Sequence, residues 1–141
     1  MLVRDVMHAE LVTVRATDSF HDAIGRMLAE HVGSVIVTRD GTPAGIVTET
    51  DVLEAAYVDV GAFDEVDVGA VMSSPLVTVE PGTTIRRAVE RMRDRDVKKL
   101  PVVEGVDLVG IVTMSDVVRH HRDFVKEAQR LEDGRTGWSP R

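Results

Sequence analysis

Apolar runs and amphipathic stretches alternate along the first half of the chain. Residues 11–14 form a short apolar run with β-branched side chains, which predicts a strand. Apolar residues then recur with a helical period over 20–28, behind side chains at 17–19 that can cap a helix. The remaining elements predicted for this half are a strand at 35–37, a turn at 39–42, a strand at 44–48 and a helix from about Thr50.

The same pattern returns 65 residues later without a gap, so that residues 3–53 align with 68–118. Leu-Val-Thr-Val occurs at 11–14 and again at 76–79, and Gly-Ile-Val-Thr occurs at 45–48 and again at 110–113. Agreement over this length indicates an internal duplication. The elements predicted for the second copy are strands at 76–79, 100–103 and 108–113, and helices at 84–94 and from about Ser115.

Each copy has the order βαββα, and one such unit is too small to bury both faces of its sheet. We therefore expect an α+β fold in which two βαββα units pack sheet to sheet about a pseudo-twofold axis and share one core. The first unit spans residues 1–60, with an acidic, exposed linker to 67, and the second spans 68–122. Residues 123–141 are expected to form a C-terminal helix extension and a flexible tail, in which Trp138 has no assigned role.

Composition narrows the class of protein. The chain has 141 residues, a formal charge of −7 and no cysteine. The absence of cysteine excludes disulfides and thiolate chemistry and is typical of a reducing cytoplasm. The negative charge argues against general nucleic-acid binding. No signal-peptide pattern and no apolar run near the roughly 18 residues of a membrane span are present, so we expect a soluble, cytoplasmic protein.

Signals for catalysis are weak. No nucleophile-elbow, phosphate-loop or dinucleotide-binding motif is present, and the five histidines are not spaced as metal ligands. We therefore expect no catalytic residues, no resident cofactor or metal, and no enzyme activity. A hydrolase that uses Asp51 or Asp116 ranks low, because no companion base or metal set is visible.

Each third strand ends in the pattern G-h-h-T-x-x-D, where h is apolar, at residues 45–51 and 110–116. Glycine allows a close approach to the backbone, and the aspartate falls in the first helical turn, where the macrodipole favours its charge. A carboxylate there can accept hydrogen bonds from both hydroxyls of a ribose, and helix N-termini can hold phosphate oxygens. The spacing is also that of a helix cap. Both roles stay open, and they are compatible.

The duplicated motif, the two Leu-Val-Thr-Val blocks and Leu-Pro-Val-Val at 100–103 make residues 1–120 resemble a tandem pair of cystathionine-β-synthase (CBS) domains, a Bateman module. The resemblance implies a regulatory module that binds AMP, ADP, ATP or S-adenosylmethionine in clefts between the motifs and passes the signal to an effector protein. It implies that Asp51 and Asp116 bind ribose hydroxyls and that Thr48 and Thr113 contact ribose or phosphate. The full set of ligand-binding residues implied is Thr13, Val14, Val35, Ile46, Thr48, Asp51, Thr78, Val79, Lys98, Lys99, Leu100, Pro101, Ile111, Thr113, Ser115 and Asp116.

The two copies differ where a ligand would lie. Ser34 to Ile36 of the first copy align with Lys99 to Pro101 of the second. Residues 86–99 hold seven basic and three acidic residues, a formal charge of +4, whereas the aligned residues 21–34 carry −1. We predict unequal clefts, with phosphate preferring the one that contains Lys98 and Lys99. The alternative, that both lysines are solvated, stays open.

The last helix continues beyond the repeat, with Phe124, Ala128 and Leu131 as an apolar stripe. Because such a stripe would otherwise lie in water, we expect a homodimer in which this helix joins the interface or packs across its own module. The alternative to a ligand-sensing function is a structural one. The chain would then be a dimerisation module whose clefts stay empty.

Overall fold

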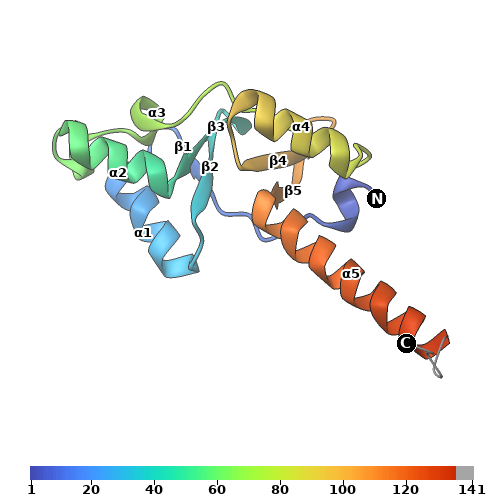
Figure 1. The fold of residues 1–141 in the computed structure, drawn as a ribbon. Coiled ribbons are helices and arrows are strands. Elements are labelled where there is room, and N and C mark those ends of the chain that lie inside the picture. The colour runs from blue at the N-terminus through green and yellow to red at the C-terminus, as the bar shows by residue number, and fades with distance from the viewer. Residues whose placement is uncertain (136–141) are drawn as a thin grey trace.

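The structure, a computed structural model, describes residues 1–135 except for the side chains of Phe124 and of residues 133–135. Gly137, Trp138 and Pro140 of the predicted tail lie outside the described residues. The described chain forms two lobes, with the first copy of the repeat on the left of Figure 1 and the second on the right.

The first lobe contains a three-stranded sheet. β1 (Thr13–Arg15) runs parallel to β2 (Ser34–Arg39), and β2 pairs antiparallel with β3 (Thr42–Thr48). Asp40 and Gly41 connect β2 and β3 with φ angles of 51° and 81°, as a two-residue type I′ hairpin requires. The helices are α1 (Phe20–Glu30), which Ser19 caps, and α2 (Glu49–Val58). The elements predicted for this copy are confirmed.

The second lobe repeats this order with one strand fewer. Its elements are α4 (Ile85–Arg95), the antiparallel pair β4 (Lys99–Glu104) and β5 (Asp107–Thr113), and α5 (Met114–Arg135). The strand predicted at 76–79 is wrong, since only Val79 pairs, as a single parallel bridge to Val102. In the first lobe Ile36 N donates to Val12 O at 2.9 Å. The aligned residue of the second lobe is Pro101, which has no N–H to donate and so cannot extend the pairing.

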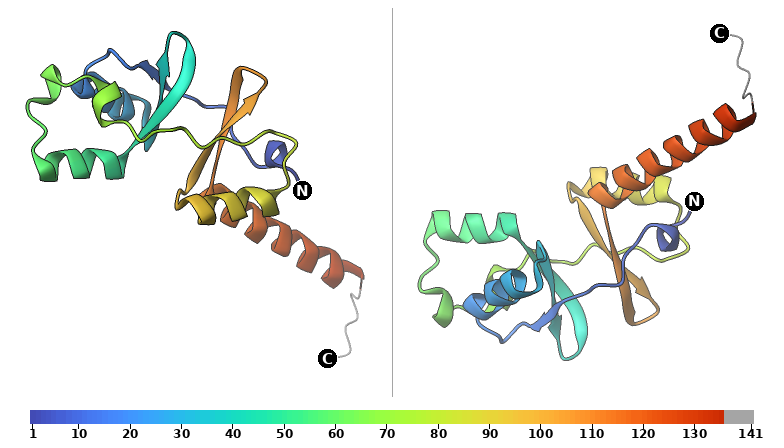
Figure 2. Two further views of the ribbon diagram at one scale, coloured as in Figure 1. Left: turned by 90° about the horizontal axis from the view of Figure 1, so that it is seen from above. Right: turned by 90° about the horizontal axis from the view of Figure 1, so that it is seen from below.

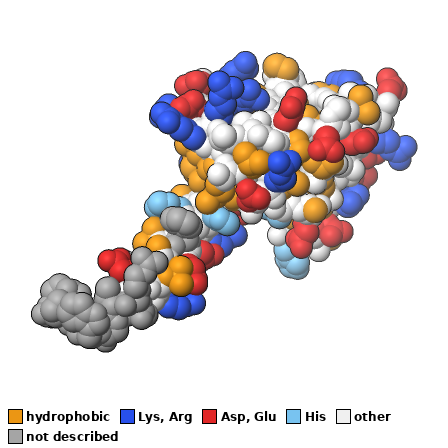
Figure 3. Space-filling view, turned by 90° about the vertical axis from the view of Figure 1, so that its right-hand side faces the viewer, with side chains coloured by type: hydrophobic (Ala, Val, Ile, Leu, Met, Phe, Trp, Pro, Cys, Tyr) orange, Lys and Arg blue, Asp and Glu red, His pale blue; other side chains and the backbone are white. Residues whose placement is uncertain are grey.

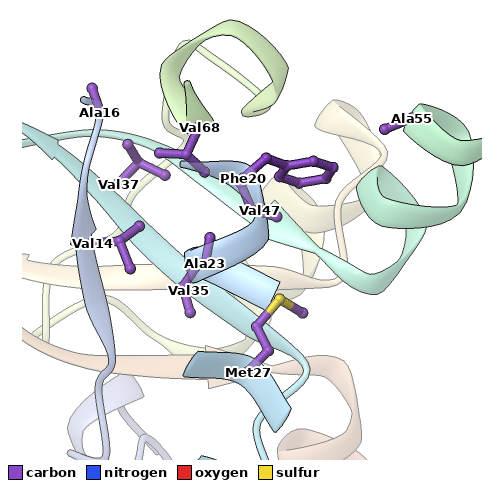
Figure 4. Packing of buried hydrophobic residues seen from close by; sticks show 10 residues of the cluster. All are labelled: Val14, Ala16, Phe20, Ala23, Met27, Val35, Val37, Val47, Ala55 and Val68. Atoms are coloured by element: carbon purple, nitrogen blue, oxygen red, sulfur yellow. The ribbon is translucent and has the colours of Figure 1, made fainter. Parts of the chain in front are cut away.

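Two short segments cross between the lobes. η1 (Val3–Asp5) opens the first copy, yet Val3 is fully buried in the core of the second lobe. α3 (Val68–Val71) opens the second copy, yet Val68 is fully buried in the core of the first lobe, beside Phe20 and Val37 (Figure 4). Val3 and Val68 are 65 positions apart, so the duplication includes this reciprocal exchange. Each lobe therefore depends on a segment from the other copy.

Buried apolar side chains form two clusters, one in each lobe, so the expectation of one shared core is wrong. Alternation along the strands explains the division. Val35 and Val37 of β2 point into the cluster beneath the helices, whereas Ile36, which is 1% exposed, lies on the opposite face of the sheet. The two hairpins lie toward the middle of the molecule and the helices lie outside (Figure 2). The α+β fold of two units packed through their sheets is thus confirmed.

The linker is more ordered than the sequence suggests. It contains η2 (Phe63–Glu65), and the ring of Phe63 packs edge-on against Phe20 with a centroid distance of 4.7 Å. Phe63 and Val66 are half-buried against the first cluster, while the acidic side chains between α2 and α3 are exposed. The prediction of an exposed linker therefore holds except at Phe63 and Val66.

α5 extends far beyond the second lobe. Its 22 residues span roughly 33 Å at 1.5 Å per residue. Figures 2 and 3 show its C-terminal part projecting away from both lobes, and the described side chains at 121–132 are exposed. Leu131 is exposed, so this extension of α5 does not pack across its own module. No described helix is long and apolar enough to span a membrane.

Candidate functional site

The larger candidate cleft lies between the two lobes, where β3 meets α2. It has a volume of about 620 Å³. The first lobe contributes the Thr-x-x-Asp end of the repeated motif, and the second contributes the segment that leads into β4. The lining residues are Gly33, Ile46, Thr48, Glu49, Thr50, Asp51, Glu54, Ser73, Asp96, Val97, Lys98 and Lys99.

Asp51 is the most connected side chain of this cleft. One oxygen, Oδ2, accepts hydrogen bonds from Thr48 N at 2.8 Å and Thr48 Oγ1 at 3.2 Å, while Thr48 Oγ1 accepts from Asp51 N at 3.4 Å. These contacts form a capping box at the start of α2. The other oxygen, Oδ1, accepts from Ser73 Oγ at 2.9 Å. Since a carboxylate has about four acceptor positions, capping leaves part of the half-buried Asp51 available to a ligand.

Lys98 and Lys99 come to this cleft from the other lobe. A Cβ placed on Gly33 would lie 3.0 Å from Lys99 Nζ and 2.6 Å from Glu49 Oε1, so a cation and a carboxylate stand close above the same glycine. Within residues 1–135, no ion pair engages Asp51, Lys98 or Lys99. The lining as a whole has four carboxylates and two lysines. The cleft can therefore offer carboxylate oxygens that accept hydrogen bonds from ligand hydroxyls, and lysine cations that pair with ligand anions.

The second cleft is smaller, at about 270 Å³. It also lies between the lobes, with residues from 8–12 and 31–36 on one side and Lys99, Ile111 and Thr113 on the other. Asp116, the counterpart of Asp51, does not line this cleft and is already engaged. Asp116 is 8% exposed and accepts a hydrogen bond from Thr113 N at 3.2 Å. Asp116 also pairs with His8 Nδ1 at 3.0 Å and Arg119 at 3.3 Å. The residues that line this cleft are His8, Glu10, Leu11, Val12, His31, Val32, Gly33, Ser34, Ile36, Lys99, Ile111 and Thr113.

The glycines of the repeated motif face the crossing segments rather than open space. A Cβ on Gly45 would lie 2.8 Å from Ser73 O and 2.5 Å from Met72 Sδ. A Cβ on Gly110 would lie 3.0 Å from His8 O and 2.9 Å from Met7 Sδ. The close approach that glycine permits is therefore used here by the chain itself.

A family model described as "CBS domain" matches the chain twice, over residues 3–57 and 68–123. The two matches cover well over half of the chain. This chain belongs to the CBS domain family. The first and second CBS domains named below are these two segments.

Known proteins agree with the assignment. The chain is 34% identical over 123 residues to the mitochondrial CBS domain-containing protein CBSX3 of Arabidopsis thaliana, an alignment covering 81% of this chain. It is 29% identical to the solved CBS-domain protein ATU1752 of Agrobacterium tumefaciens, with a TM-score of 0.76 and coverage of 84% of this chain and 91% of that one. The CBS domain pair of protein MJ0100, at 20% identity and a TM-score of 0.78, shares the fold over 87% of this chain and 97% of its own. The chain spans 58% of the length of CBSX3, and 33% and 61% of two archaeal relatives.

The structure brings together part of the site that the sequence implied. Ile46, Thr48, Asp51, Lys98 and Lys99 line the larger cleft. Ile111 and Thr113 line the smaller one, which Lys99 also reaches.

The remaining implied residues line neither cleft. Val14, Val35, Val79 and Leu100 are core residues, and Pro101 is buried. Thr13 and Ser115 are exposed, while Asp116 is bonded to His8, and Thr78 O accepts from Arg91 at 2.6 Å.

Sequence reasoning missed the two residues that reach the aspartates from the other copy. Ser73 bonds to Asp51 and His8 bonds to Asp116. Ser73 and His8 are themselves 65 positions apart, directly after the matched Val-Met pairs at 6–7 and 71–72. The alignment thus contained the signal that these positions are equivalent, but not that each contacts the other CBS domain.

Proposed function

We propose that this CBS domain pair is a regulatory module that binds an adenosine-containing ligand in the Asp51 cleft and passes the signal to an effector protein in the cytoplasm. CBS domain pairs are regulatory ligand-binding modules. The related pair of MJ0100 is described in complex with 5′-methylthioadenosine and S-adenosyl-L-methionine. We place this chain among regulators rather than enzymes, with the ligand as an effector and not as a cofactor.

The observation that carries the proposal is the make-up of the Asp51 cleft. Its volume of about 620 Å³ falls in the range of roughly 300–1,000 Å³ typical of small-molecule sites. Asp51 and Thr48 supply acceptor and hydroxyl groups for a ribose, and Lys98 and Lys99 supply cations. Ile46 and Val97 add apolar surface to the lining.

The formal charge of the cleft lining allows the candidate ligands to be ranked by expected affinity. Four carboxylates line the cleft against two lysines, a formal charge of −2. A triphosphate would bring several more negative charges into this space, whereas a monophosphate can be paired by the two lysines. A sulfonium ligand such as S-adenosylmethionine brings a positive charge that the carboxylates favour. We therefore rank AMP and S-adenosylmethionine above ADP and ATP.

The smaller cleft is the weaker site in this proposal. Its volume of about 270 Å³ is below the usual range, and Asp116, the counterpart of Asp51, does not line it and is held by His8 and Arg119. A ligand there could reach Asp116 only by displacing contacts that Asp116 already makes. We therefore expect one dominant site per chain.

Calorimetric titration of the full chain with adenosine, AMP, ATP and S-adenosylmethionine tests the proposal. We expect AMP or S-adenosylmethionine to bind more tightly than ATP. Lys98→Ala should weaken AMP about tenfold and adenosine much less, with the loss shrinking at high salt. Lys126→Ala, on the exposed part of α5, is the matched control and should leave every affinity unchanged. If no ligand of the panel binds, the alternative of a structural module with empty clefts is favoured.

A further inference from the structure

The two CBS domains differ at one place beside the first helix of each. In the first domain the ring of Phe63, from the linker, packs edge-on against Phe20 with a centroid distance of 4.7 Å, and Phe20 is fully buried. In the second domain Ile85 occupies the position of Phe20 and is only half-buried. Ile85 lines a pocket of about 320 Å³. The first domain therefore fills with an aromatic ring a place that the second leaves open.

The backbone around the pocket shows that the two places are equivalent. Val66 O accepts a hydrogen bond from Phe20 N at 2.7 Å, and the aligned Met1 O accepts one from Ile85 N at 3.1 Å. The isolated strand bridges that follow these two bonds also lie 65 positions apart. In this alignment the counterpart of Phe63 falls ahead of Met1, and the described side chains leave a pocket there.

The pocket is suited to one large apolar side chain. Aromatic side chains are enriched among the anchors that fill such pockets at protein interfaces, because they bury a large area in a fixed orientation. Phe63 is an example of such an anchor within this chain. The apolar side chains that line the pocket are those of Met1, Val6, Ile85 and Val117, beside the polar Arg86 and His121.

Charge specifies the rest of the occupant. Phe63 is followed by Asp64 and Glu65, both exposed. α1, the helix beside them, has two carboxylates and one arginine, whereas α4 has five arginines and two carboxylates and no acidic residue in its first turn. Arg86 pairs with Glu90 at 3.5 Å on the surface and has further donors available. An acidic pair would therefore be attracted more strongly to the first turn of α4 than to that of α1.

We propose that this pocket docks an effector protein through a short acidic segment with one aromatic side chain, as residues 63–65 do within the first domain. The ring fills the pocket against Ile85 and Val117, and the carboxylates lie against the first turn of α4. Figure 1 shows the N-terminus beside α4 at the outer end of the second lobe, where a partner can reach it. The inference deepens the proposed function by giving the chemistry of the effector. Docking needs no nucleotide, so its failure is distinguishable from failure of the Asp51 cleft.

A peptide with the sequence of residues 61–65, Gly-Ala-Phe-Asp-Glu, tests the proposal when titrated into the ¹⁵N-labelled full chain without nucleotide. A single buried anchor supports a dissociation constant of about 1 mM. We expect the amide signals of Ile85 and Val117 to shift and those of the aligned Phe20 and Val52 to stay, because Phe63 already occupies the first domain. Unshifted signals at Ile85 and Val117 would overturn the proposal.

Two altered peptides test the chemistry of the occupant. Replacing the phenylalanine by alanine should weaken binding at least tenfold. Replacing the Asp-Glu pair by Lys-Lys should weaken it several-fold, and the difference between the two charged peptides should shrink at high salt. Equal binding of the alanine peptide would overturn the aromatic anchor, and equal binding of the lysine peptide would overturn the acidic partner.

Two variants of the chain locate the binding. Ile85→Glu puts a carboxylate into the pocket at the start of α4, where the helix dipole favours it, so the protein should stay folded and bind the peptide at least tenfold more weakly. Val106→Glu, at a 90% exposed position on the β4–β5 turn, is the matched control and should bind like the wild type. If the peptide does not bind and the signals of Ile85 and Val117 instead shift on dilution, a second copy covers the pocket and the proposal is overturned.

Discussion

Replacing Gly45 by alanine tests whether the crossing segment is held against the motif strand. The added Cβ would lie 2.8 Å from Ser73 O and 2.5 Å from Met72 Sδ. The methionine side chain can move, but the backbone of Ser73 is fixed by two hydrogen bonds to the backbone of Ile46. Ile46 N donates to Ser73 O at 3.1 Å, and Ser73 N donates to Ile46 O at 2.8 Å.

The expected cost follows from these contacts. Moving the segment by enough to admit a methyl group breaks or lengthens both hydrogen bonds, each contributing about 1 kcal/mol. Crowding of Met72 adds to this, as is usual for overpacked sites. We therefore expect Gly45→Ala to lower the free energy of unfolding by about 2–3 kcal/mol.

Urea unfolding followed by circular dichroism measures this loss. Gly25→Ala is the matched control, because Gly25 lies within α1 and a Cβ there meets nothing within 4 Å. In a helix interior alanine is favoured over glycine by about 0.8–1.0 kcal/mol, so this variant should be more stable than the wild type. A Gly45→Ala protein within about 0.5 kcal/mol of the wild type would refute the close packing described here.

Two further stability predictions concern the second CBS domain. Val3→Ala should cost about 2 kcal/mol in urea unfolding, because Val3 is fully buried in that core despite opening the first copy, and Val106→Ala, on an exposed turn, should cost almost nothing. Asp116→Ala should cost about 1–2 kcal/mol, chiefly for the lost helix cap, since His8 and Arg119 are partly exposed and their pairs count for less. An unchanged midpoint for Val3→Ala would contradict the exchange of segments, and one for Asp116→Ala would contradict the capping role.

Local patterns predicted most of the fold, because helical periodicity, capping residues and turn chemistry act over a few residues. Ser19, the Asp40–Gly41 turn and the Thr48–Asp51 box all have signals that can be found in the sequence alone. The strand at 76–79 was mispredicted because its pairing depends on a donor at position 101, which is far along the chain and is a proline.

Contacts between the copies could not be predicted in the same way. The pairing of His8 with Asp116 and of Ser73 with Asp51 joins residues that no periodicity relates. The repeated motif predicts the same role for both aspartates. In the structure Asp51 lines a cleft and stays accessible to a ligand, whereas Asp116 is paired with His8 and Arg119. That difference arises from His8 and Arg119, whose counterparts near Asp51 are Ser73 and Glu54.

Titration of AMP and S-adenosylmethionine into Asp51→Asn and Asp116→Asn, with the wild type alongside, tests the central claim most directly. Asparagine keeps a helix-capping acceptor and removes the charge, so both variants should stay folded. We expect Asp51→Asn to weaken the better ligand at least tenfold, which is about 1.4 kcal/mol, and Asp116→Asn to change its affinity less than threefold. Undiminished affinity in Asp51→Asn, or a larger loss in Asp116→Asn, would contradict the assignment of the Asp51 cleft as the ligand site.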